Sequence, residues 1–246
     1  MIDIFITAYL RPMFTEQTLI YLFERTKAPY RLFLINNGGN DDIAKVYEKE
    51  IFLTLNMSRN IGITAAWNLA MGLAESDYFI TSDNDIYVPD LEPDWLTQMI
   101  KFMDERPDYG AISLHPHVFI GAAGIDPADP EDVKERNMCG AVMRIMRREA
   151  VIKAGGWKDD EPLIRPDRGH EERTICSRLQ TAGFKTGIAS RIRAYHPFGK
   201  NIPNNSGWGY PPEFPPELQG HNPELKEYVE QFDQMEAYDN KTWLPK

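Results

Sequence analysis

Short apolar runs alternate with amphipathic segments along most of the chain, and this alternation predicts the fold. The apolar runs have the length and composition of strands, and each ends in a polar or glycine-containing turn: Ile2–Thr7, Tyr30–Ile35, Ile51–Leu55 and Tyr78–Thr81. The segments between them, 15–25, 42–49 and 64–74, carry apolar residues at helical spacing. Strands that alternate with helices in this way predict an α/β fold, in which a Rossmann-like, mostly parallel central sheet is flanked by helices on both faces.

The rest of the chain is expected to extend this domain and then to change in character. We expect helices at Trp95–Met103, Glu149–Ala154 and Glu171–Thr181, and strands at Tyr109–Leu114, Cys139–Met146 and Lys185–Tyr195. Residues 121–137 and 159–169 show no period and are expected to be loops. From Gly199 the chain is rich in proline, asparagine and aromatic residues. We therefore expect one domain over residues 1–198 and a C-terminal extension over 199–246, with a loop able to act as a lid and a terminal helix.

Composition narrows the class of protein. Hydrophobic residues make up 42% of the 246 residues and charged residues 26%, as in ordinary soluble domains. The formal net charge of −10 argues against a nucleic acid as the main partner. No apolar run approaches the roughly 20 residues of a membrane span. Cys139 and Cys176 lie far apart without metal-ligand spacing and are expected to be buried and reduced. With no signal-peptide pattern at the N-terminus, these features favour a cytoplasmic protein.

Candidate chemistry gathers where the predicted strands end. Asp83-Asn84-Asp85 directly follows the run Tyr78–Thr81. In open α/β sheets the carboxyl ends of the strands form the ligand-binding edge, and hard divalent cations prefer carboxylate oxygens. A polar turn, in which the Asp and Asn side chains bond their own backbone, is the simpler alternative. Other polar groups fall at the ends of neighbouring predicted strands, and this convergence favours a ligand site: Thr7, Asn36, Asn37 and Asn60.

Several motifs in a fixed order resemble those of GT-A glycosyltransferases, and the chain is most similar to the inverting family 2 type from about Ile2 to His196. The motifs are Leu34-Ile35-Asn36-Asn37-Gly38, Asn60-x-Gly62 with Ala66-x-Asn68, Asp83-Asn84-Asp85, Met146-Arg147-Arg148 through Gly155-Gly156-Trp157, Glu171-Glu172 with Arg178, Leu179 and Gly183, and Tyr195-His196-Pro197-Phe198-Gly199. The chain departs from the family at Asn36, where the family has a base-contacting Asp, and at Glu172, where it has the shorter Asp. The departure at Asn36 bears on which nucleobase of the donor is preferred. The departure at Glu172 bears on how far the side chain reaches toward the acceptor.

The resemblance implies transfer of a sugar, with inversion, from a nucleotide-sugar donor (UDP-, GDP- or dTDP-linked) to a hydroxyl of a glycan or another acceptor. It implies a Mn²⁺ or Mg²⁺ ion on the diphosphate, with Asp85 as direct ligand, His196 as second protein ligand, and Asp83 at the donor ribose or a metal-bound water. Imidazole ligation favours Mn²⁺ over Mg²⁺. A half-buried structural role is the alternative for His196.

The resemblance assigns Glu172 as general base. Neighbouring residues on a helix point about 100° apart, so Glu171 is expected to bond sugar or acceptor hydroxyls instead. Acids also favour helix N-termini through the helix dipole, a role compatible with catalysis. His170 is the rival base, because an unperturbed histidine titrates near neutral pH.

The donor nucleotide is expected to contact residues from several strand ends. They are Thr7, Asn36 and Asn37 around the nucleoside, Arg59 near the base or phosphate, and Asn60 and Asn84 nearby. Asn60 and Asn68 equally suit loop-pinning roles.

Two other functions remain open. A sugar-phosphate nucleotidylyltransferase would carry a glycine-rich loop after the first strand, and this chain has no glycine there. A glycan- or nucleotide-binding module without catalysis is the other.

Overall fold

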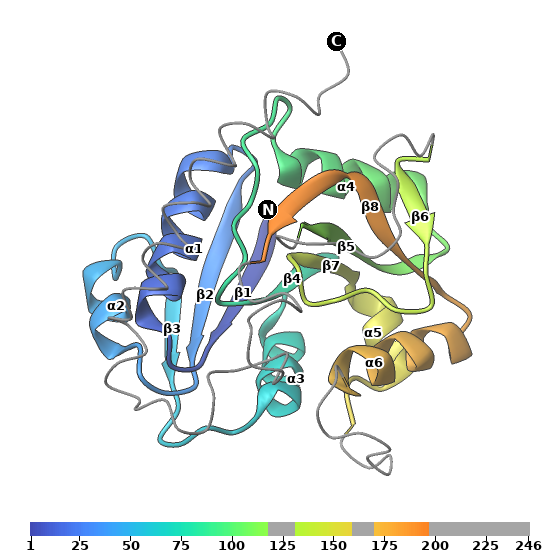
Figure 1. The fold of residues 1–246 in the computed structure, drawn as a ribbon. Helices are drawn as coiled ribbons and strands as arrows, with labels where there is room; N and C mark the ends of the chain where they lie inside the picture. The colour runs from blue at the N-terminus through green and yellow to red at the C-terminus, as the bar shows by residue number, and fades with distance from the viewer. Residues whose placement is uncertain (118–130, 159–169, 197–246) are drawn as a thin grey trace, which may run out of the picture.

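The computed structural model describes residues 1–117, 131–158 and 170–196, which form a sheet covered by helices (Figure 1). The strands are β1 (Ile2–Ala8), β2 (Tyr30–Asn36), β3 (Leu53–Asn56), β4 (Tyr78–Asp83), β5 (Tyr109–His117), β6 (Val133–Glu135), β7 (Arg144–Arg147) and β8 (Lys185–Tyr195). The helices are α1 (Pro12–Arg25), α2 (Asp41–Val46), α3 (Ile63–Leu73), α4 (Trp95–Glu105), α5 (Arg148–Ala154) and α6 (His170–Thr181). The predicted C-terminal extension lies outside the described residues, so the domain boundary at residue 198 and the lid stay predictions.

The sheet is mostly parallel, as the alternation of strands and helices predicts. Its strand order is β3-β2-β1-β4-β7-β5-β8-β6. The pairs β3–β2, β2–β1 and β1–β4 are parallel, and so is β5–β8. β7 runs antiparallel between β4 and β5, and β6 runs antiparallel along β8 at the edge. The parallel strands β1 to β4 therefore end at one common edge, where the polar motifs lie.

Helices cover both faces of the sheet and divide its core into two layers. Along β1, Ile4 and Ile6 face the layer that contains α1, α2 and α4, whereas Phe5 faces the layer that contains α3, α5 and α6 (Figure 1). Side chains alternate across a strand, so a strand buried on both faces reads as a continuous apolar run. The described ranges contain no helix with the length and hydropathy of a membrane span.

The predicted strand Cys139–Met146 is wrong over its first half, since only residues 144–147 belong to β7. The backbone of Ala141 bonds outside the sheet ladder: its N–H donates to a Glu172 carboxylate oxygen at 2.9 Å, and its carbonyl accepts from the Asp83 N–H at 3.2 Å. Met143 has a left-handed φ of 42°, which breaks an extended strand. The predicted loop 121–137 also contains a strand, the short edge strand β6.

An ion pair between β1 and β2 should make the free energy of unfolding depend on pH in the acidic range. The buried Asp3 carboxylate accepts from Arg31 Nε at 2.7 Å and from the Glu75 N–H at 2.8 Å. Burial alone would raise the pKa of Asp3, but Arg31 and the two backbone donors outweigh it and lower that pKa. A depressed pKa contributes stability that is present above the ordinary Asp value of about 3.9 and is lost as pH falls through the folded-state value.

Asp3→Asn is therefore expected to lower the free energy of unfolding at pH 7 by about 2 kcal/mol. The difference from wild type should shrink below pH 4, a bound set by the ordinary Asp pKa of about 3.9. Urea unfolding at both pH values measures it. Glu75→Gln is the matched control, because Glu75 pairs with the same Arg31 from the exposed surface and should change stability by less than about 0.5 kcal/mol. Equal effects of the two variants at pH 7 would contradict the prediction.

Candidate metal and nucleotide site

The polar residues predicted at strand ends lie side by side at the carboxyl edge of the parallel strands. Thr7 on β1 pairs in register with Asp83 on β4. Asn36 on β2 pairs with Ala8 on one side and with Asn56 of β3 on the other. This edge is where α/β sheets bind ligands.

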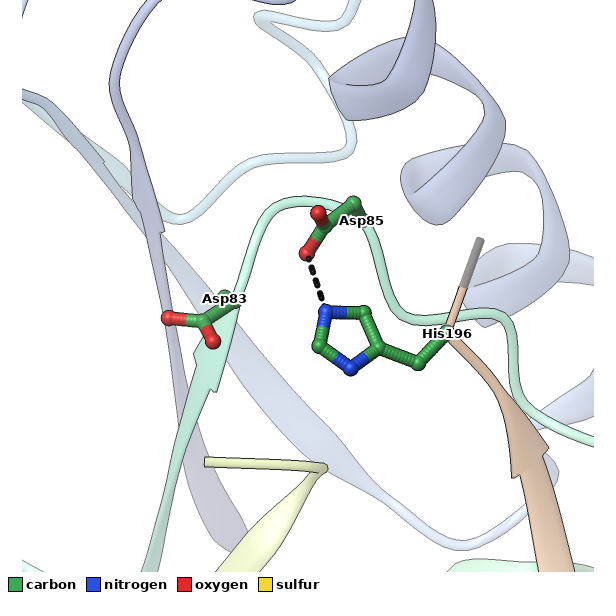
Figure 2. Close-up of side chains that lie close together, drawn as sticks. All are labelled: Asp83, Asp85 and His196. Carbon is green, nitrogen blue, oxygen red and sulfur yellow. Dashed lines mark ion pairs between the residues drawn. The ribbon is translucent and has the colours of Figure 1, made fainter. Parts of the chain in front are cut away.

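Asp83, Asp85 and His196 form one cluster of candidate metal ligands. Asp83 ends β4, Asp85 follows in the adjoining turn, and His196 comes directly after β8 (Figure 2). The His196 Nε2 atom lies 3.4 Å from the Asp85 Oδ1 atom. One ligand atom from each of the three residues lies within 4.8 Å of the others. Two carboxylates and an imidazole within this span fit a divalent cation such as Mn²⁺.

A backbone bridge between distant segments delivers His196 to this cluster. Tyr87, two residues after Asp85, exchanges both backbone hydrogen bonds with Tyr195, each at 2.9 Å. The bridge fastens the turn after β4 to the end of β8. It therefore explains how a histidine far along the chain reaches the acidic turn.

Negative charge and burial shift the pKa values in this cluster. Burial, and then the Asp85 charge, raise the pKa of Asp83 to about 8, with Glu172 and Glu171 contributing. Burial alone would raise the pKa of Asp85, but His196 and Arg11 outweigh it and lower that pKa. Burial would lower the pKa of His196, but the charge of Asp85 and the hydrogen bond with it outweigh burial and raise that pKa. The cluster therefore carries more carboxylates than neighbouring cations neutralise, as a cation site does.

Arg11 completes the cluster and was missed by the sequence analysis. Its Nη1 atom donates to Asp85 Oδ2 at 2.9 Å. Arg11 caps α1 with a left-handed φ of 55°, and the preceding Leu10 has a φ of 54°. Left-handed conformations of such residues cost roughly 1–2 kcal/mol each and gather at functional sites. The available sequence signal was a basic residue next to a proline at the end of the first strand.

Asn84 is held between the acidic turn and helix α1. Its amide nitrogen donates to Thr15 Oγ1 at 2.7 Å and to the Leu10 carbonyl at 3.3 Å. The backbone carbonyl of Asn84 accepts from Thr18 Oγ1 at 3.0 Å. These bonds support a positioning role for Asn84, and the predicted contact with the nucleotide sugar stays a prediction.

Two of the asparagines predicted to bind the donor nucleotide, Asn37 and Asn60, bond to each other. Asn37 Nδ2 donates to Asn60 Oδ1 at 2.8 Å, and the Ile61 N–H donates to Asn37 Oδ1 at 2.9 Å. These contacts are consistent with the loop-pinning alternative for Asn60, and its contact with the donor nucleotide stays a prediction. Arg59 is exposed beside them. Thr7 Oγ1 is buried and has no hydrogen-bond partner among the described residues, so it is available to a ligand.

The departure from the family at Asn36 has a local physical reason. Asn36 Nδ2 donates to Asp41 Oδ1 at 2.8 Å and to Asn56 Oδ1 at 2.9 Å. An aspartate at position 36 would place a carboxylate against that of Asp41, whereas the amide donates to it. The exposed Asp41 thus puts a carboxylate next to the position where the family has its own.

The acidic pair at the start of α6 reaches the same site. Glu172 is 6% exposed, and its Oε1 atom accepts from the Ala141 N–H at 2.9 Å. The Ala141 carbonyl in turn accepts from the Asp83 N–H at 3.2 Å, so one residue connects Glu172 to the end of β4. Glu171 is half-buried beside it. The side chain of His170 lies outside the described residues, so the choice of base stays a prediction.

Comparison with known proteins agrees with this architecture. Structural neighbours include TarS from S. aureus in complex with UDP-GlcNAc, at 14% identity and a TM-score of 0.63, covering 85% of this chain and 61% of that one. They also include the mannosyltransferase PcManGT from Pyrobaculum calidifontis in complex with GDP-Man and Mn²⁺, at 14% identity and a TM-score of 0.61, covering 82% of this chain and 58% of that one. The chain thus spans about three-fifths of PcManGT and of the solved TarS 1-349 segment, and 36% of a longer solved TarS chain.

The likeness to these structures confirms the predicted GT-A fold. No curated protein matches the chain at a significant level. The family model described as Glycosyl transferase family 2 matches residues 3–155, which include nearly all of the parallel strands β1 to β4, the acidic turn and β7. That match covers more than half of the chain and confirms the family expected from the motifs. The chain belongs to glycosyl transferase family 2.

Proposed function

We propose that the chain transfers a sugar from a nucleoside-diphosphate donor to an acceptor hydroxyl, with inversion and with the help of a divalent cation. The convergence of Asp83, Asp85 and His196 within 4.8 Å, at the edge where the parallel strands end, carries the proposal. Family membership and the donor complexes of the neighbouring structures support it.

Asp85 and His196 would hold the cation, and Mn²⁺ is the first choice because PcManGT was solved with it and imidazole suits it. When bound, the cation neutralises the charge that develops on the leaving diphosphate. Asp83, at the end of β4, would contact the donor ribose or a water bound to the cation. The free hydroxyl of Thr7 and the carboxylate of Asp41 lie at the same edge and offer hydrogen bonds to the nucleoside.

Glu172 would act as the general base. The acceptor oxygen bonds to the anomeric carbon while its proton passes to the Glu172 carboxylate, and the bond to the nucleoside diphosphate breaks with its electron pair on the phosphate. A base must reach the proton it removes in a fixed geometry. The bond from the Ala141 N–H fixes one Glu172 oxygen and leaves the other for the acceptor. Glu171 would accept hydrogen bonds from sugar or acceptor hydroxyls.

One incubation tests the proposed activity against its alternatives. The chain is mixed with Mn²⁺ and a panel of UDP-, GDP- and dTDP-sugars, and the released phosphates are identified. Release of nucleoside diphosphate that stops on adding a chelator is the expected result. Release of pyrophosphate from a nucleoside triphosphate and a sugar phosphate would instead indicate a nucleotidylyltransferase. Tight donor binding without turnover on any acceptor would indicate a binding module.

Arg11 should compete with the cation for Asp85. Its guanidinium donates to Asp85 Oδ2 at 2.9 Å, so a cation that binds this oxygen would displace Arg11, whose charge would then serve the donor diphosphate. Arg11→Gln is expected to tighten Mn²⁺ binding without nucleotide by about tenfold, the worth of one charge-assisted bond. The same variant should lower turnover. Isothermal titration with Mn²⁺ measures the first effect, and the exposed Lys45→Ala is the control for a general change of charge. Unchanged or weaker Mn²⁺ binding in Arg11→Gln would contradict this competition.

A further inference from the structure

The two cysteines of the chain meet beneath the candidate site, although they are far apart in sequence. The Cys139 and Cys176 Sγ atoms are 3.7 Å apart, which is van der Waals contact, and both side chains are fully buried. The Cys139 N–H also donates to Cys176 Sγ at 3.4 Å. A disulfide has an S–S distance of about 2.05 Å, so the two sulfur atoms would approach by roughly 1.6 Å on forming one.

The thiol pair is adjacent to the contact that holds the proposed base. Cys176 and Glu172 are one helical turn apart on the same buried face of α6. Opposite them, Cys139 and Ala141 belong to the irregular segment that precedes β7. The Cys139–Cys176 contact and the bond from the Ala141 N–H to Glu172 are therefore consecutive links between the same two pieces of chain.

The surroundings of the pair make Cys176 the more acidic of the two thiols, whereas the hydrogen bond between them and burial raise the pKa of Cys139. The fully buried Arg144 donates to the Cys139 carbonyl at 3.3 Å, and its Nε atom has no hydrogen-bond partner among the described residues. Among the residues that the structure describes, no carboxylate forms an ion pair with Arg144. The hydrogen bond with Cys139, followed by the Arg144 charge, outweighs burial and lowers the pKa of the Cys176 thiol to about 7. Thiolate character is what permits attack on an oxidant.

We propose that Cys139 and Cys176 are a redox modification site, in which a reversible disulfide displaces Glu172 and lowers transfer activity. The oxidant is a small peroxide, which suits a buried pair. The Cys176 thiolate attacks hydrogen peroxide to give a sulfenic acid and hydroxide, and the Cys139 thiol then displaces water to form the S–S bond. The two thiols lose two protons and two electrons, and the peroxide takes these up and is reduced to two waters.

Close packing transmits the movement of the sulfur atoms to Glu172. A Cβ atom added at Gly140, between the two links, would lie 3.1 Å from Glu172 Oε1, so the segment has little room to shift independently of the carboxylate. A misplacement of about 1 Å in a catalytic group can cost on the order of 100-fold in rate. The oxidised chain is therefore expected to lose roughly 10- to 100-fold in turnover, an expectation that rests on the proposed function.

The test treats the whole chain with hydrogen peroxide, alkylates free thiols and measures the intact mass. Oxidised wild type is expected to be lighter by two hydrogens and to resist alkylation at both cysteines. Dithiothreitol should restore both the reduced mass and the alkylation. In ¹⁵N-correlated spectra the Ala141 amide resonance should move on oxidation. Cys139→Ala and Cys139→Ser, two variants in case one folds poorly, should form no intramolecular disulfide and should keep their Ala141 resonance on peroxide treatment.

The outcomes separate this inference from the proposed function. A folded chain that gives only intermolecular disulfides or over-oxidised thiols would overturn the inference, as would a disulfide that leaves the Ala141 amide and turnover unchanged. The mass and the resonance remain informative if the reduced chain shows no transfer at all, a result that would count against the proposed function alone.

Discussion

Asp85→Asn is expected to lower cation-dependent turnover by at least about 10³-fold, because the stabilisation that a cation gives the leaving diphosphate is worth several kcal/mol. Asp85 contacts two other residues of the cluster: one carboxylate oxygen lies 3.4 Å from His196 Nε2, and the other lies 2.9 Å from Arg11 Nη1. Asparagine keeps the shape and removes the charge. Turnover at saturating donor and Mn²⁺, with the nucleoside diphosphate quantified, measures the loss.

The matched control for this variant is Asp42→Asn, which removes an exposed carboxylate on α2, away from the cluster. It should keep wild-type turnover. A melting temperature close to that of wild type shows that Asp85→Asn is folded. Mn²⁺-dependent turnover of Asp85→Asn within tenfold of wild type would remove Asp85 from the proposed cation site.

Glu172→Gln should have the second largest effect, a loss of about 10²–10⁴-fold in kcat with nearly unchanged nucleotide affinity, which is the range for a general base. Glutamine still accepts the bond from the Ala141 N–H, so the position of the side chain is kept while its basicity is lost. Single-turnover rates and titration with nucleoside diphosphate separate the two quantities.

Glu171→Gln is the companion variant, from the neighbouring position on α6. It is expected to weaken turnover less than Glu172→Gln, because Glu171 is assigned to hydroxyl contacts. An active Glu172→Gln together with an inactive Glu171→Gln would exchange the two roles. Retained activity in both variants would point to His170.

The sequence pattern predicts the parallel half of the sheet well because its strands β1, β2 and β4 are largely buried on both faces. Phe5 and its neighbours Ile4 and Ile6 fill opposite layers, so β1 appears in the sequence as an uninterrupted apolar run. The pattern is less informative around Ala141, where backbone groups bond to Glu172 and Asp83 in place of a neighbouring strand. Such bonds depend on residues that are distant in sequence, and no local periodicity reports them.

The candidate site was predicted where its residues are close in sequence or belong to a motif. It was missed where a contact depends on the backbone conformation or on packing. Asp83 and Asp85 were identified because they lie one residue apart at the end of a strand, and His196 was identified through its motif. Arg11 was missed because its contact with Asp85 depends on a left-handed backbone that local propensity does not favour. The contact between Cys139 and Cys176 depends on how α6 packs against the segment before β7. The roles assigned to all of these residues stay predictions.

Anomalous X-ray scattering from crystals grown with Mn²⁺ and a nucleoside diphosphate tests the central claim most directly. We expect one strong manganese peak within coordination distance of an Asp85 carboxylate oxygen and of His196 Nε2, with Arg11 released from Asp85. A manganese peak elsewhere, or a bound diphosphate with Arg11 still paired to Asp85 and no metal beside it, would contradict the account.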